Sequence, residues 1–121
     1  MQVLAEATKG RWFTDAFRET SPETVDRMIA MLTSTPPDGY AACCEALATF
    51  DSWFALPSGG APVRGGAGAD DPVATPAVCE EMASVIPGAD LVVVRDCSHI
   101  APVGQPEAFA RAVVEHLEKH L

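Results

Sequence analysis

The sequence predicts an α/β fold in which a helical segment precedes a βαβα unit with two parallel strands. In the first half of the chain, apolar residues recur with the helical period, whereas the second half alternates short apolar runs with helical patterns. Pro57, Gly59 and Gly60 form a cluster of helix-breaking residues between the two halves. We therefore expect a helical segment over residues 1–56 and an α/β segment over residues 57–121.

Several helices are expected in the first segment. Residues 1–18 carry an amphipathic pattern interrupted by Gly10, which indicates two short helices. Ser21 and Pro22 suit the N-cap and the first position of a longer helix, which ends before the prolines at positions 36 and 37. The apolar face of this helix consists of Val25, Met28, Ile29 and Leu32.

A further helix is expected from about Asp38 to Phe50, because apolar residues again share one face. These residues are Tyr40, Cys43, Cys44 and Leu47. The chain has 4 cysteines, and their spacing fits neither a disulfide framework nor a paired C-x-x-C motif. We expect free structural thiols, with Cys43 and Cys44 buried.

The second segment is expected to form a strand over residues 62–67, a helix opened by Thr75 and Pro76, a strand over residues 91–94, and a last helix from residue 105. The inward face of the last helix is expected to consist of Phe109, Val113, Val114 and Leu117. Two parallel strands leave unpaired edges, and Gly65 and Gly66 weaken the first strand. We infer that part of the sheet is absent from this chain.

Composition and charge exclude some classes of partner. The formal net charge is −9, with 17 acidic residues against 8 lysines and arginines, so a phosphate backbone is repelled. No apolar run approaches the roughly 20 residues that span a bilayer. Residues 1–9 lack the basic and apolar regions of a signal peptide. We expect a cytoplasmic protein with no nucleic-acid or membrane partner.

Polar residues follow both predicted strands. Asp70 and Asp71 come after the first strand, and His99 comes after the second. The carboxyl ends of parallel strands lie at one edge of a sheet, where ligand and catalytic groups gather. A carboxylate there can orient an imidazole for proton transfer. The alternative is that these residues only shape turns or face solvent.

Three sets of motifs carry a family resemblance. The first set lies in the helical segment, at residues 11–17, 37–43 and 50–51. The second set surrounds the acid, at residues 68–72 and 75–76. The third set surrounds the histidine, at residues 86–89, 98–99 and 105–109. Together they resemble the cap region, the acid loop, and the histidine loop with its closing helix in 3-oxoadipate enol-lactonases. The resemblance implies a partial α/β-hydrolase fold, with residues 1–56 as the cap segment.

The resemblance also implies a reaction and site residues. Its Gly-x-x-Asp pattern places the catalytic acid at Asp71, and His99 takes the place of the base. A serine of such enzymes attacks a small lactone or ester in the β-ketoadipate route of aromatic degradation, and no metal or organic cofactor is implied. Trp12 corresponds either to a wall of the substrate pocket or to a core residue of the cap. Arg11 either faces a substrate carboxylate or is solvated.

The sequence departs from this family at the nucleophile. The motif Gly-x-Ser-x-Gly is absent, since Ser58 precedes the acid and Ser98 adjoins the histidine. Gly104 replaces a residue that is acidic in the family. We therefore expect the isolated chain to be inactive. Three interpretations stay open: a remnant of a lactonase gene, one half of a split enzyme that lacks its N-terminal half, or a non-catalytic domain that self-associates through its strand edges.

Overall fold

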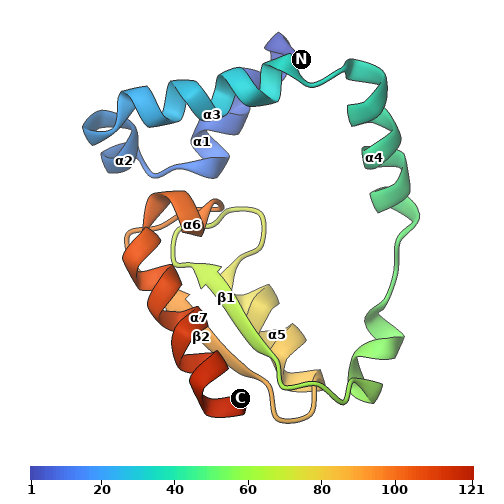
Figure 1. Ribbon diagram of the computed structural model, residues 1–121. Helices are drawn as coiled ribbons and strands as arrows, with labels where there is room; N and C mark the ends of the chain where they lie inside the picture. Colours follow the sequence, from blue (N-terminus) through green and yellow to red (C-terminus); the bar gives the residue numbers. More distant parts are fainter.

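A computed structural model describes residues 1–121 and confirms the predicted fold class. The first part of the chain is wholly helical (Figure 1): η1 (Gln2–Leu4), α1 (Ala5–Trp12), α2 (Asp15–Thr20), α3 (Pro22–Ser34) and α4 (Pro37–Thr49). The remainder contains the predicted βαβα unit: η2 (Trp53–Ser58), β1 (Arg64–Gly68), α5 (Pro76–Val85), β2 (Asp90–Val94), α6 (Ala101–Gly104) and α7 (Pro106–His120). The short helix α6 has no counterpart among the predicted elements. None of the helices combines the length and apolar character that a membrane crossing requires.

The two predicted short helices near the start of the chain are α1 and α2, but the break between them is not at Gly10. Gly10 lies within α1, and the chain becomes extended at Phe13. Thr14 then caps α2, because its Oγ1 accepts a hydrogen bond of 3.2 Å from the backbone N–H of Phe17. A glycine inside a helix costs only about 1 kcal/mol relative to alanine, so Gly10 does not interrupt α1. The capping threonine instead marks where α2 begins.

The core of the helical part lies between α1 and α3. Phe13 is only 2% exposed and stacks on Phe17 at a ring-centroid distance of 5.3 Å. The predicted face of α3 is confirmed, since Val25, Ile29 and Leu32 are buried. Two residues that follow the histidine, Ile100 and Val103, also pack against this cluster. The core of the helical part therefore continues into the α/β part.

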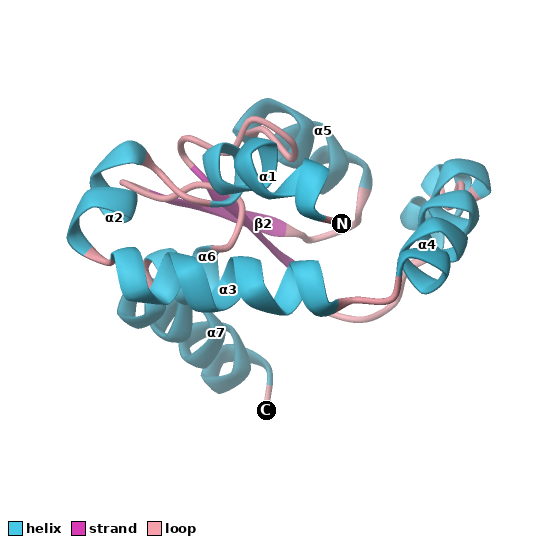
Figure 2. Ribbon diagram, turned by 90° about the horizontal axis from the view of Figure 1, so that it is seen from above, coloured by secondary structure: helices cyan, strands magenta, loops and turns pink.

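Helix α4 stands apart from the other elements (Figures 1 and 2). The prediction that Cys43 and Cys44 are buried is wrong, because both are exposed. Leu47 and Phe50 are each 71% exposed. The helical period identifies an apolar face, but no other element of this chain covers it. The whole chain exposes 8141 Å², whereas a compact monomer of its mass exposes about 6,200 Å².

Strands β1 and β2 pair in parallel, in a register that runs from Arg64 opposite Asp90 to Gly68 opposite Val94. The first strand therefore begins two residues later than predicted. Helices α5 and α7 lie on opposite faces of this pair (Figure 1). Since only two strands are present, the outer edge of each strand has unpaired backbone groups.

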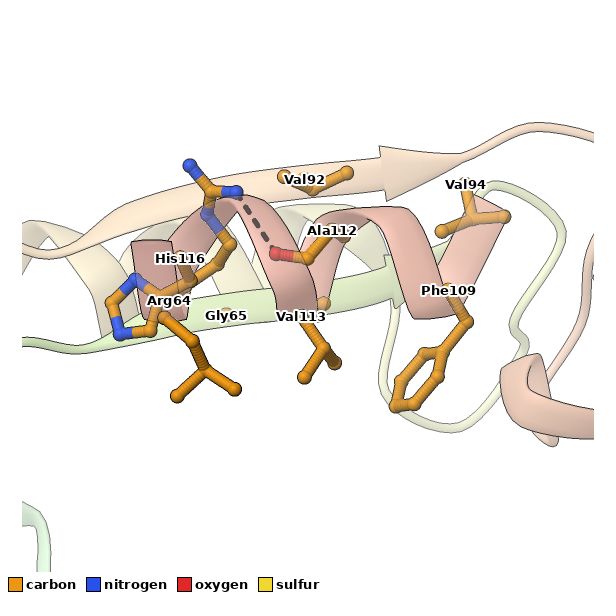
Figure 3. Close-up of a pocket in the computed structure, with 10 residues that line it drawn as sticks. Arg64, Gly65, Val92, Val94, Phe109, Ala112, Val113 and His116 are labelled. Atoms are coloured by element: carbon orange, nitrogen blue, oxygen red, sulfur yellow. Dashed lines mark hydrogen bonds between the residues drawn. The ribbon is translucent and has the colours of Figure 1, made fainter. Parts of the chain in front are cut away.

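The inward face predicted for α7 is only partly correct. Val113 and Leu117 line an open groove of about 180 Å³ over Gly65 and Gly66 (Figure 3), but they stay 42% and 46% exposed. Val114 is 50% exposed. Gly65 and Gly66 offer no side chains on which Val113 and Leu117 could pack.

Arg64 joins three elements of the α/β part. Its Nε and Nη2 each donate a hydrogen bond of 2.8 Å to the carboxylate of Asp90. Its Nη1 donates one of 3.0 Å to the carbonyl oxygen of Ala112, which Figure 3 shows. The hydrogen bond from Arg64 lowers the pKa of Asp90 from 3.8 to about 2. Strand β1 is thus fastened to β2 and to α7 by one side chain.

This contact predicts a specific loss of stability in acid. A carboxylate with a lowered pKa stabilises the folded chain above its unfolded pKa of 3.8, and the contribution disappears as the pH falls toward 2. In Asp90→Asn, we expect the thermal midpoint to be lower at pH 6 and to depend less on pH between 5 and 2. Melting curves by circular dichroism would measure both quantities. Equal pH dependence in the two proteins would contradict the prediction.

Candidate active site

The acid loop begins where β1 ends and is held against the histidine loop by backbone hydrogen bonds. The N–H of Ala69 donates to the carbonyl of Val94 at 2.8 Å, and the N–H of Asp70 donates to that of Cys97 at 2.9 Å. Gly68 lies at the crossing point of the two loops. A Cβ atom there would lie 2.6 Å from the carbonyl oxygen of Cys97 and still closer to that of Ser98. Only glycine allows the two loops to approach this closely.

The histidine loop turns back over the acid loop immediately after β2. Asp96 adopts a left-handed backbone conformation, with φ of 52°, which aspartate tolerates better than most residues. Cys97 and Ser98 are then buried, at 1% and 4% exposure. This turn brings the next residue, His99, to the acid.

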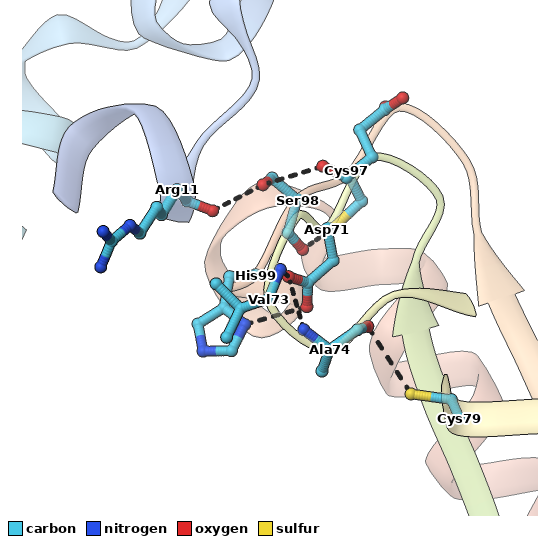
Figure 4. Close-up of polar contacts among 9 residues, drawn as sticks. Arg11, Asp71, Val73, Ala74, Cys79, Cys97, Ser98 and His99 are labelled. Atoms are coloured by element: carbon cyan, nitrogen blue, oxygen red, sulfur yellow. Dashed lines mark hydrogen bonds and ion pairs between the residues drawn. The ribbon is translucent and has the colours of Figure 1, made fainter. Parts of the chain in front are cut away.

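Asp71 and His99 are in direct contact (Figure 4). Nδ1 of His99 lies 2.9 Å from Oδ2 of Asp71. The other carboxylate oxygen of Asp71 accepts hydrogen bonds from the backbone N–H groups of Val73, at 2.8 Å, and Ala74, at 3.1 Å. Asp71 is 6% exposed, whereas the His99 side chain is 34% exposed. The carboxylate is therefore fixed and dry, and the imidazole faces outward.

The electrostatics keep Asp71 ionised at neutral pH. Burial by itself raises the pKa of Asp71, but the hydrogen bonds from His99, Val73 and Ala74 outweigh burial and lower the pKa. An ionised Asp71 accepts the Nδ1 proton of His99, and this tautomer leaves Nε2 without a proton. Nε2 is then available to take a proton from a hydroxyl group, which is the geometry of a general base and its orienting acid.

The two residues predicted to bind substrate lie at the end of α1. The side chain of Arg11 is exposed, and its carbonyl oxygen accepts a hydrogen bond of 2.7 Å from Ser98 Oγ. Trp12 is partly buried and packs against the core of the helical part. No hydrogen bond or ion pair joins either side chain to Asp71 or His99. Substrate binding by Arg11 and Trp12 stays a prediction.

No hydroxyl or thiol group of this chain is hydrogen-bonded to His99. Ser58 donates to the carbonyl of Ala55 at 3.0 Å, and Ser98 donates away from the imidazole. Burial raises the pKa of the Cys97 thiol, so this neighbour is not a thiolate at neutral pH. No group of three or more His, Cys, Asp or Glu side chains is placed to hold a metal ion.

Sequence reasoning missed two residues that shape the site. Gly68 is the first residue of the Gly-x-x-Asp pattern, and the pattern itself was the signal that its side-chain-free backbone was needed. Ser98 belongs to the motif around the histidine, but nothing in that motif indicates which group its hydroxyl contacts. Its partner, Arg11, is 87 residues away in the sequence, and no local pattern reveals such a contact.

The chain is similar in sequence to curated hydrolases. No protein-family model matches the sequence. The chain is 42% identical over 110 residues to 3-oxoadipate enol-lactonase 2 of Acinetobacter baylyi, covering 91% of this chain and 41% of that protein. It is 37% identical over 106 residues to 3-oxoadipate enol-lactonase 1 of the same organism, covering 88% of this chain and 40% of that protein.

Solved structures show the same likeness. The enol-lactonase from Burkholderia xenovorans LB400 superposes with a TM-score of 0.94 at 35% identity, covering 98% of this chain and 45% of that one. A thermophilic esterase from Thermogutta terrifontis superposes with a TM-score of 0.92 at 32% identity, covering 98% of this chain and 44% of that one. The chain thus spans about two fifths of the length of the curated relatives it matches.

Proposed function

Because the chain has part of the α/β-hydrolase fold and resembles 3-oxoadipate enol-lactonases, we propose that it supplies the acid and the base for hydrolysis of a lactone or ester. The observation that carries the proposal is the contact of 2.9 Å between Asp71 and His99. The enol-lactone of 3-oxoadipate is the proposed substrate, since both curated relatives are named for it.

The proposed reaction uses His99 twice. A serine hydroxyl attacks the lactone carbonyl, its proton passes to Nε2 of His99, and Asp71 stabilises the imidazolium that forms. The bond to the ring oxygen then breaks, and this oxygen takes the proton from His99. Water repeats the sequence on the acyl-serine, which releases the acid and restores the serine.

The serine and the oxyanion-binding amides come, in this proposal, from a complementary segment that this chain does not contain. Two observations support it: no hydroxyl or thiol of the chain is hydrogen-bonded to His99, and the relatives are more than twice as long as the matched region. The chain alone is then inactive, whether the segment belongs to a separate protein or to the same gene.

Four free cysteines accord with a cytoplasmic location.

Complementation tests this function. The chain is co-expressed with the part of the Burkholderia xenovorans enol-lactonase that it does not cover, and hydrolysis of the enol-lactone is followed by absorbance. We expect no turnover from either part alone and turnover from the pair. Hydrolysis by the chain alone that disappears in His99→Ala would show that the nucleophile lies within the chain, against the proposal.

A non-catalytic, self-associating domain is the second candidate. It is supported by the unpaired edges of the two-stranded sheet and by the uncovered apolar face of α4. In that case the chain forms a defined oligomer, and the double variant Asp71→Asn/His99→Ala leaves its size unchanged. Light scattering of both proteins over a range of concentrations distinguishes this candidate from the hydrolase.

A further inference from the structure

We propose that the C-terminal end of α1 positions His99 for proton transfer, through two hydrogen bonds that we call the α1 clamp. In the first, Ser98 Oγ donates to the carbonyl oxygen of Arg11 at 2.7 Å. In the second, the N–H of Ile100 donates to the carbonyl oxygen of Trp12 at 3.3 Å. The inference rests on the proposed function, because it assigns His99 the role of the base.

The clamp uses carbonyl groups that a helix cannot satisfy by itself. The last four carbonyls of a helix have no partner within it, and Arg11 and Trp12 are the last two residues of α1. Their two donors come from the residues immediately before and after His99. The backbone of His99 is therefore held on both sides by consecutive residues of one helix, as the Ser98 contact in Figure 4 illustrates.

Burial makes the clamp rigid. Ser98 is 4% exposed, so water does not compete for its hydroxyl group. The side chain of Ile100 packs against the core cluster that contains Phe13. Ser98 Oγ also lies 3.3 Å from the carbonyl oxygen of Asp70, next to the acid. The Ser98 side chain thus joins the histidine loop, to which it belongs, to both α1 and the acid loop.

The clamp gives residues 11 and 12 a role through their backbone. A shift of α1 is transmitted to the backbone of His99, and it changes the distance between the imidazole and the fixed carboxylate of Asp71. In contrast to a substrate-binding role, this one does not require the side chain of Arg11. Ser98 is a positioning residue, since it acts on the reaction only through His99.

The experiment measures how fast the Nδ1 proton of His99 exchanges with solvent, by NMR of the full chain labelled with ¹⁵N-histidine. The variants are Ser98→Ala, which removes the hydroxyl group, and Ser98→Cys, which keeps the shape but donates weakly. We expect exchange to be roughly five- to tenfold faster in Ser98→Ala, the factor that one lost buried hydrogen bond gives, and intermediate in Ser98→Cys. If the alanine variant does not fold, Ser98→Cys alone decides.

The matched control is Thr14→Ala, which removes the cap of α2 near the clamp without removing a bond to the histidine loop. It is compared with Ser98→Ala at temperatures equally far below the two thermal midpoints. Equal acceleration in both variants, or none in the Ser98 variants, overturns the clamp. If the wild-type Nδ1 proton itself exchanges freely, the Asp71–His99 contact is absent, and it is the proposed function that fails.

Discussion

His99→Ala is expected to lower kcat of the complemented hydrolase by a factor of about 10⁴ or more, because no other group can take the proton from the nucleophile. KM should change little, since the imidazole contributes to the transition state more than to substrate binding. Steady-state hydrolysis of the enol-lactone, measured with the chain saturated by its complement, gives both constants.

The chain offers a matched control for this substitution. His116 lies on α7, where its Nε2 is 3.3 Å from the carbonyl oxygen of Pro62, and it is not hydrogen-bonded to the acid loop. His116→Ala should retain nearly full activity. Asp71→Asn should lose a factor of about 10⁴, since an amide favours the wrong tautomer of the imidazole. Comparable rates in His99→Ala and His116→Ala would remove His99 from the mechanism.

Gly68→Ala is expected to destabilise the chain by about 3 kcal/mol and to separate Asp71 from His99. The added Cβ would meet the carbonyl oxygens of Cys97 and Ser98, and backbone atoms cannot rotate away as a flexible side chain does. Relief of the clash requires the two loops to move apart. Urea unfolding measures the loss of stability, and exchange of the His99 Nδ1 proton measures the separation.

Gly66→Ala is the control on the same strand. A Cβ at Gly66 meets no atom within 4 Å, so this substitution should change stability by less than about 1 kcal/mol. A comparable loss of stability in both variants would mean that β1 needs glycine only for its backbone flexibility. In that case the close approach of the two loops would not explain why Gly68 is needed.

Local pattern was sufficient to predict the elements that position the acid and the histidine. The branched run at residues 91–94 and the breakers around it predicted β2, and the strand ends predicted that Asp71 and His99 could meet. Periodicity also predicted α4 within a residue at either end. It wrongly predicted that Cys43 and Cys44 are buried. An apolar helix face indicates that a packing partner is needed, but not that this chain provides the partner.

The sequence pattern could not predict contacts between residues that are far apart along the chain. The hydrogen bond between Ser98 and Arg11 joins residues that are 87 apart, and neither residue type is unusual at its position. The break between α1 and α2 followed the side chain of Thr14 instead of Gly10, because a specific capping bond outweighs a small difference in helix propensity. Sequence pattern thus locates Asp71 and His99, whereas tertiary contacts fix how the two residues are held.

Helix α4 links the helical part to the α/β part and stands apart from both (Figure 1). The core between α1 and α3 packs against Ile100 and Val103. The last two carbonyls of α1 also accept hydrogen bonds from the histidine loop, and none of these contacts involves α4. A protease that cuts this solvated helix would sever the only covalent tether between the two parts. The nicked products should nevertheless co-elute as one particle, because the contacts between the two parts lie on the side of the molecule opposite α4 (Figure 1).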